Sequence, residues 1–122
     1  MKTSSAKNKG RLLQQYVAKK IKEILGIAEE DAISRPMGSA GSDIILSKAA
    51  LDKIPLDIEC KNTKIFPSLA ALDQSKSRGS KHYPAAVWKP PRKGMEDSII
   101  YFRLEDFLNL IKDKEVEKKN DE

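Results

Sequence analysis

The sequence has little cysteine, little histidine and no long hydrophobic run, and each shortage excludes a class of protein. Its one cysteine, Cys60, cannot form an internal disulfide bond. One cysteine and one histidine, His82, argue against a zinc site and exclude a four-cysteine iron–sulfur cluster. No apolar stretch approaches the length of a membrane span, and the first residues lack the apolar segment of a signal peptide. We therefore expect a protein without a membrane partner that works in the reducing cytoplasm.

Acidic residues are missing from two windows of the chain, which are rich in basic residues instead. Residues 1–22 hold seven basic side chains and no acid, and residues 74–95 hold six basic side chains and no acid. Two such windows in a short chain favour a polyanionic partner, most simply nucleic acid. A solvated surface that only keeps the protein soluble is the alternative. The candidate nucleic-acid contacts in these windows are Lys9, Arg11, Lys76, Arg78 and Lys81.

The length of 122 residues suits one domain. Residues 1–7 are expected to form a flexible basic arm, and residues 8–111 a single folded domain. The charged segment at residues 112–122 is expected to be a disordered tail. The sequence has no glycine-rich phosphate cradle, so we expect no nucleotide cofactor.

Hydrophobic periodicity and turn residues predict a mixed α/β domain. The predicted helices cover residues 8–25, 67–76 and 105–112, with a brief helix capped by Ser47. The predicted strands cover residues 32–33, 44–46, 56–61, 84–89 and 98–102. The predicted buried face of the last helix consists of Phe107, Leu108 and Ile111. This order of elements is typical of a mixed central β-sheet flanked by helices.

The segment LDIECK, residues 56–61, places charged side chains on a predicted buried strand. Side chains alternate along a strand, so the apolar and the charged side chains point to opposite faces. The apolar set is Leu56, Ile58 and Cys60, and the charged set is Asp57, Glu59 and Lys61. Charged groups are rarely buried unless they are paired or bind a metal. One interpretation is an ion pair between Glu59 and Lys61 at the edge of a sheet.

Metal-dependent hydrolysis of phosphodiesters is the other interpretation. Mg²⁺ binds carboxylate and carbonyl oxygens and keeps several waters. Asp43, which begins the predicted strand DIIL, can add a carboxylate to that of Glu59, and the backbone carbonyl of Cys60 can be a further ligand. Lys61 can orient the attacking water or stabilise charge on the phosphate. We therefore expect a Mg²⁺ (or Mn²⁺) site formed by these residues.

Asp43, fifteen intervening residues and then ECK at residues 59–61 resemble the signature of the PD-(D/E)XK nuclease superfamily. The segments NKGRLLQQYV, GSAGSDIIL and IECKN, with Gln74 on the later helix, look most like the phage and archaeal Holliday-junction-resolvase-like members. The resemblance spans about residues 8–108, and the order of predicted elements is similar to the family's core. It implies a restriction-endonuclease-like core, so that the single domain is a nuclease domain.

The resemblance also implies roles for the matching positions. Asp43 and Glu59 would bind the metal, and Lys61 would be the catalytic lysine. Gln14 stands where family members often carry a glutamate, and its amide oxygen can bind the metal or a metal-bound water. Ser42 stands where the family usually has a proline. The neutral Gln14 leaves the number of metals open.

Other polar positions have two interpretations each. Resembling members use a glutamine at the position of Gln74 to contact the site or a phosphate, but an exposed helix residue is the alternative. Some resolvases carry a serine like Ser39 near the scissile phosphate, and turn chemistry explains Ser39 equally well. Asp57 is expected at the outer end of its strand rather than as a ligand.

These observations favour a metal-dependent DNA endonuclease that resolves branched DNA such as Holliday junctions. A symmetric junction needs paired cuts, so the expected working form is a homodimer. A restriction-like or repair nuclease acting on duplexes or ends is one alternative, and a catalytically decayed DNA-binding module is another. The resemblance alone suggests a phage-encoded protein that acts in the host cytoplasm.

Overall fold

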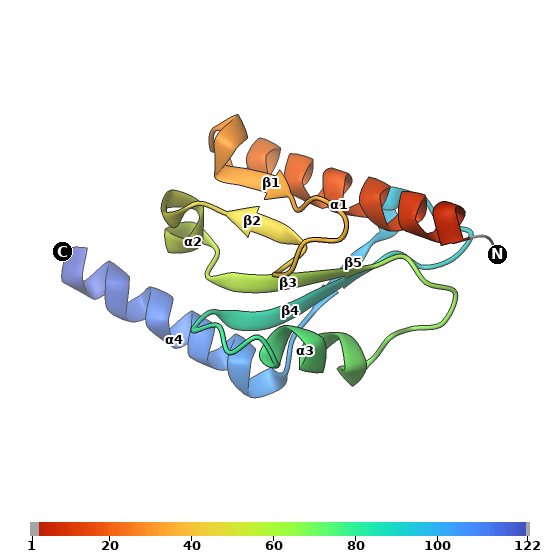
Figure 1. Ribbon diagram of the computed structural model, residues 1–122. Helices are drawn as coiled ribbons and strands as arrows, with labels where there is room; N and C mark the ends of the chain where they lie inside the picture. Colours follow the sequence, from red (N-terminus) through yellow and green to blue (C-terminus); the bar gives the residue numbers. More distant parts are fainter. Residues whose placement is uncertain (1–2, 122) are drawn as a thin grey trace.

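The structure, a computed structural model, describes residues 3–121 and consists of layers of helix and sheet (Figure 1). Helix α1 lies on one side of the strands, and α3 lies on the other side. The helices are α1 (Thr3–Leu25), α2 (Lys48–Lys53), α3 (Leu69–Lys76) and α4 (Leu104–Asp121), with 3-10 turns at η1 (Glu29–Asp31) and η2 (Met95–Asp97). The strands are β1 (Ala32–Ser34), β2 (Ile44–Leu46), β3 (Leu56–Lys61), β4 (Tyr83–Trp88) and β5 (Ile99–Tyr101). The prediction of a mixed α/β protein is confirmed.

The strands form two sheets rather than the one central sheet that the sequence predicts. β1 and β2 pair antiparallel, with Ile33 opposite Ile45. β3 is parallel to β4, and β4 is antiparallel to β5, so the three-stranded sheet is mixed. The two sheets meet just before β2, where the Asp43 amide donates a hydrogen bond to the Ile58 carbonyl at 3.0 Å. The short strand β2 does not continue this pairing, which separates one predicted sheet into two.

The main hydrophobic core lies between α1 and the sheets. Leu13 and Val17 are four residues apart on one face of α1, and they belong to one buried cluster with Ile58 and Val87. Ile24 follows the same periodicity but is 77% exposed, so the last turn of α1 contributes less to this core. A second, smaller cluster joins α3 to the opposite side of β4.

Helix α1 begins at Thr3, and this corrects the prediction of a flexible arm over residues 1–7. Residues 1–2 lie outside the described part of the chain. The sequence before Gly10 contains neither proline nor glycine, and Ala6 and Lys7 favour helix. The helix therefore extends toward the N-terminus beyond its predicted start.

Helix α4 extends through residues 112–121, which the sequence analysis assigns to a disordered tail. Its first turn contains acids and its last turn contains lysines, an arrangement that suits the helix macrodipole. The Tyr83 hydroxyl donates a hydrogen bond to the Asp113 carboxylate at 2.5 Å. The Lys114 ammonium donates to the Asp52 carbonyl. These tertiary contacts join the charged segment to the domain and explain why it is helical.

The predicted buried face of α4 is wrong. Phe107 is 44% exposed, Leu108 is 54% exposed and Ile111 is 45% exposed. Leu110 packs against the main core instead. The tertiary contacts of α4 turn a different side of the helix inward, which periodicity within the helix cannot specify.

The other elements lie close to their predicted positions. Ser47 caps α2 as predicted, because its hydroxyl accepts a hydrogen bond from the Ala50 amide at 3.1 Å. Helix α3 begins at Leu69, since Ser68 has a non-helical backbone with φ 53° and ψ −140°. The ends of β4 and β5 differ from prediction by about one residue. Within residues 3–121, each helix is either too short or too polar to span a membrane.

Candidate active site

The charged face of β3 is buried on the side of the sheet that α3 covers. Glu59 is 1% exposed and Asp57 is 7% exposed, whereas Lys61 lies at the strand end with 29% of its side chain exposed. Ala86 is the partner of Glu59 across the β3–β4 ladder. Its small side chain leaves room for a carboxylate, so the fold accommodates an acid inside the sheet–helix interface.

Asp43 lies where the two sheets meet, and its carboxylate is fixed beside β3. Its Oδ2 accepts a hydrogen bond from the Cys60 amide at 2.7 Å. Burial, and then the negative charge of Asp43, raise the pKa of Glu59 from its ordinary 4.5 to about 7. The structure therefore brings together the two carboxylates that the sequence analysis selects as metal ligands.

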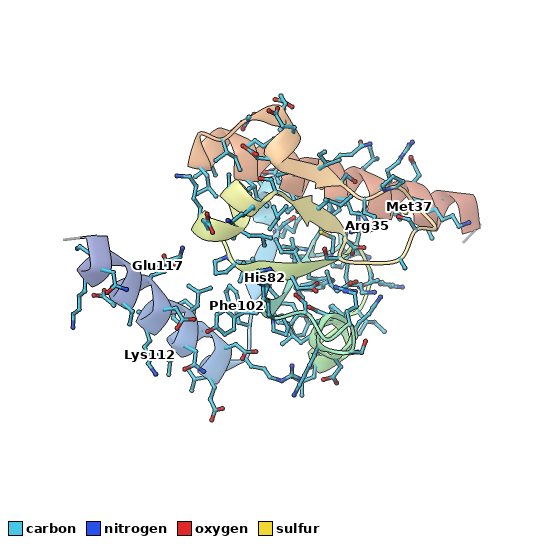
Figure 2. All side chains as sticks on the ribbon, turned by 60° about the vertical axis from the view of Figure 1, so that its left-hand side comes forward. Arg35, Met37, His82, Phe102, Lys112 and Glu117 are labelled. Atoms are coloured by element: carbon cyan, nitrogen blue, oxygen red, sulfur yellow. The ribbon has the colours of Figure 1, made fainter. Side chains whose placement is uncertain are left out.

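The loop between β1 and β2 fixes the position of Asp43. The Arg35 amide donates to the Asp43 carbonyl at 2.8 Å, and Arg35 Nε donates to the Ser42 carbonyl at 2.6 Å. Gly41 has φ +126°, and a Cβ on it would lie 2.5 Å from the Arg35 guanidinium carbon. Figure 2 shows Arg35 on this loop, close to the strands. A glycine at this position lets the arginine fold back over the loop.

Arg78, from the loop after α3, pairs with both buried acids of β3. Its Nη1 donates to Glu59 Oε1, and its Nε and Nη2 donate to the Asp57 carboxylate. The sequence predicts Asp57 at the outer end of the strand and Arg78 on DNA, but the structure places both side chains in this ion pair. Such pairing reduces the free energy that the burial of two carboxylates would otherwise cost.

Lys61 is held beside Glu59 by a residue of α3. Its Nζ donates a hydrogen bond to Gln74 Oε1 at 2.7 Å and lies 4.0 Å from Glu59 Oε2. Gln74 therefore reaches the site through Lys61 rather than through an acid. The hydrogen bond to Gln74 therefore holds the Lys61 ammonium group next to the Glu59 carboxylate.

Gln14 is buried on α1, but it has a different partner from the acids. It is 6% exposed, and its Oε1 accepts a hydrogen bond from the Ser34 hydroxyl at 3.0 Å. Within residues 3–121, no hydrogen bond joins Gln14 to Asp43 or Glu59. In this geometry the amide ties α1 to β1.

The residues that could hold a metal ion are Asp43, Glu59 and the carbonyl of Cys60. The Cys60 amide faces Asp43 rather than β4, and the N–H and C=O of one strand residue point to the same side. Two carboxylates and a carbonyl suit Mg²⁺, which keeps several waters and needs few protein ligands. No cluster of three or more His, Cys, Asp or Glu side chains able to hold a metal occurs in residues 3–121. This set of oxygen donors therefore fits a hard cation that keeps most of its waters, rather than one bound by protein ligands alone.

Within residues 3–121, the predicted DNA-binding residues of α1 and the glycine-rich turn form no ion pair with Asp43 or Glu59, although the Lys9 carbonyl accepts a hydrogen bond from the Asn62 side chain just after β3. Lys9 lines an open groove of about 710 Å³, together with Lys64 and Arg92 from other segments. Arg11 is exposed and donates to Asn8 on its own helix. The Ser39 hydroxyl donates to the Pro36 carbonyl at 2.9 Å, which is a local turn contact.

The basic residues after α3 lie near a second hollow. Lys76 and His82 line an open depression of about 640 Å³, together with Arg103. Lys81 is exposed beside it. Only Arg78 of the second basic window reaches the acids of β3, and the other members face outward.

The pairing of Arg78 with Asp57 and Glu59 is the feature that sequence reasoning missed. A signal was present, because two acids with i, i+2 spacing on a buried strand face require a cation. The sequence could not say which of the many basic residues supplies it.

Comparison of the chain with protein-family models, with curated proteins and with solved structures gave no match.

Proposed function

We propose that the protein is a metal-dependent DNA endonuclease that hydrolyses phosphodiester bonds. The observation that carries the proposal is the convergence of Asp43 and Glu59 beside Lys61. These acids come from separate segments, and a cation between them would reduce the repulsion that raises the pKa of Glu59. The resemblance of the same positions to the PD-(D/E)XK signature supports this chemistry and a restriction-endonuclease-like core.

In the proposed mechanism Asp43, Glu59 and the Cys60 carbonyl would hold Mg²⁺ (or Mn²⁺). When bound, the cation would supply Lewis-acid chemistry, by polarising the phosphate and making a nearby water more acidic. Lys61 steadies the attacking water or the charge that develops on the phosphate, and Gln74 positions the Lys61 ammonium. The water oxygen loses a proton to solvent as it bonds to phosphorus. The bond to the leaving sugar oxygen breaks, and that oxygen takes up a proton from solvent, so the protons balance.

The basic surface supports DNA as the substrate. The groove lined by Lys9, Lys64, Lys89 and Arg92 brings the start of α1 together with residues near the ends of β3 and β4. Phosphate contacts by lysine and arginine supply most of the non-specific affinity for DNA. The single Cys60, buried and free, suits the reducing cytoplasm in which we place this activity.

The exposed apolar residues of α4 support a homodimer, the form that cuts a symmetric junction in pairs. Leu104, Leu108 and Ile111 recur on one side of the helix and are each at least 45% exposed. Its first turn is acidic and its last turn is basic, so two copies packed antiparallel along this side place opposite charges together. Figure 2 shows Lys112 and Glu117 on the part of α4 that extends away from the sheets. Leu108→Glu should then convert a dimer into a monomer by analytical ultracentrifugation.

The decisive experiment incubates the protein and Mg²⁺ with four matched DNAs: a four-way junction, a flap, a plain duplex and a single strand. We expect paired nicks in the junction, and none with Asp43→Asn. Cleavage confined to duplexes or ends would retain the active site but replace the resolvase assignment with a restriction-like or repair nuclease. Cleavage by Asp43→Asn at the wild-type rate would contradict the proposed site.

A decayed DNA-binding module is the second candidate function, and two observations favour it. Arg78 already neutralises Glu59, and Gln14 is bonded to Ser34 rather than directed at the acids. In such a module the arginine replaces the metal permanently. Retained DNA binding without cleavage in either Mg²⁺ or Mn²⁺ would support this function.

A further inference from the structure

An apolar cavity adjoins the candidate active site and has no role in the mechanism above. It lies between the loop at residues 62–68 and the start of α3, with a volume of about 320 Å³. Its floor includes Ala71, which is fully buried, and its walls include Ile65 and Phe66. No acidic side chain lines it.

The loop that forms this cavity is tied to the sheet. The Trp88 indole N–H donates to the Thr63 carbonyl at 3.0 Å, and the Tyr101 hydroxyl donates to the Ser68 carbonyl at 2.8 Å. The ring centroid of Phe66 lies 5.1 Å from that of Trp88 and 5.0 Å from that of Tyr101. The loop is thus anchored at both ends and in the middle.

Two apolar side chains of this anchored loop nevertheless face solvent. Ile65 is 80% exposed and Phe66 is 44% exposed. Because the loop backbone is anchored, these side chains stay exposed. Phe66 and Ile65 both line the cavity on its solvent side.

The cavity is continuous with the candidate catalytic groups. Lys61 and Gln74, whose side chains are hydrogen-bonded at 2.7 Å, form part of its wall. A phosphate placed against the Lys61 ammonium therefore carries its nucleotide to the mouth of the cavity. A nucleobase has flat apolar faces that stack on aromatic side chains, and its sugar–phosphate is anionic. The cavity is open to solvent and places apolar side chains beside one ammonium group, which matches both parts of that ligand.

We infer that this cavity binds an unpaired nucleobase next to the phosphate that the enzyme attacks. The inference rests on the proposed nuclease function and names its substrate class: DNA with an unpaired or readily unstacked nucleotide at the cleavage site. A paired base must leave the helical stack to enter, and that step costs free energy, least for a base that is already unpaired. Phe66 supplies the stacking surface, and Ile65 separates the base from its neighbours.

The test measures binding without cleavage. Two duplexes of the same sequence are compared in EDTA, one with a single unpaired 2-aminopurine and one with that base paired to thymine. We expect the wild-type protein to bind the unpaired form at least about tenfold more tightly, with a change in 2-aminopurine fluorescence as the base stacks. Phe66→Ala should reduce this preference by about fivefold or more.

Two further variants protect the test against misfolding and non-specific effects. Ala70→Leu fills the cavity from the exposed side of α3 without removing any packing around Trp88. It should abolish the preference while the affinity for the paired duplex is unchanged. Leu69→Ala is the matched control, because Leu69 is 56% exposed beside the loop but does not line the cavity. It should leave the preference intact.

The outcomes separate this inference from the proposed function. Equal affinity of the wild-type protein for both duplexes, or equal loss of affinity for both in Ala70→Leu, overturns the inference. A preference that depends on the cavity, together with no cleavage in Mg²⁺, supports the cavity as a nucleobase site but rejects the nuclease function on which the substrate class rests. Cleavage at the same rate with and without an unpaired base supports the nuclease function and rejects the inference.

Discussion

Ile58 and Glu59 are neighbours in β3 and equally buried, each 1% exposed, but they face opposite sides of the sheet. Ile58 packs in the main core against α1, where removal of apolar surface from water is itself favourable. Glu59 faces α3, where its burial depends on Arg78 and Lys61. A paired charge contributes little net stability compared with an apolar residue of the same volume. The apolar face of β3 therefore stabilises the fold, whereas the charged face adds little stability and carries the residues of the candidate site.

The largest predicted effect on stability comes from removing Arg78, the cation on the charged face of β3. Arg78→Ala leaves two buried carboxylates without their partner, so the free energy of unfolding should fall by about 3–5 kcal/mol. Urea denaturation in EDTA measures the loss. In a background that carries Asp57→Asn and Glu59→Gln, the same substitution should cost less than about 1 kcal/mol, since no charge then needs pairing. An equal loss in both backgrounds would mean that Arg78 acts through packing alone.

The apolar face should respond to truncation without any dependence on charge. Ile58→Ala should lower the free energy of unfolding by about 2–5 kcal/mol, from lost burial and the cavity that remains. The loss should be the same at pH 5 and pH 8 by urea denaturation. A loss that varied strongly with pH would show that the two faces are not independent.

Lys61 lies on the charged face of β3 but is partly exposed, so its effect on DNA cleavage can be separated from its effect on stability. Lys61→Ala should reduce the rate of DNA cleavage by about 10²–10³-fold while the melting temperature changes little. Single-turnover cleavage assays and thermal denaturation measure the two effects. Lys53→Ala, on α2, is the matched control and should leave the rate unchanged. A normal rate in Lys61→Ala would remove this lysine from the proposed mechanism.

The last predicted effect concerns pH. The pKa of Glu59 is about 7 in the folded protein and 4.5 is its ordinary value, so the folded state holds an extra proton between these values. The stability from this group is therefore complete below pH 4.5 and is lost as the pH rises through 7. Glu59→Gln should flatten that part of the stability curve, measured by urea denaturation in EDTA. A wild-type curve that rises over the same range would contradict the raised pKa.

The sequence predicts what depends on local periodicity and on spacing. The two faces of β3 follow from a period of two, and the cap at Ser47 follows from the residues around it. The approach of Asp43 to Glu59 is favoured by the order of the predicted strands, because each residue lies at or beside a strand that the sequence predicts.

Features set by tertiary contacts could not be predicted in this way. The pairing of Arg78 with Glu59 spans 19 positions and depends on the path of the chain after α3. The buried side of α4 depends on where Tyr83 and Asp52 hold that helix, and its own periodicity suggests a different side. The separation of one predicted sheet into two reflects the direction of β2 after Asp43, which no pattern in the strand specifies.

The backbone hydrogen bond from Asp43 to Ile58 has a mechanical consequence. It lies at the seam between the two sheets, which otherwise share α1 as a common support. The Asp43 carboxylate adds a second hydrogen bond across the seam, from the Cys60 amide, so a cation bound by Asp43 and Glu59 would be a third link. Occupancy of the site would then strengthen the junction between two sheets that already share one hydrophobic core.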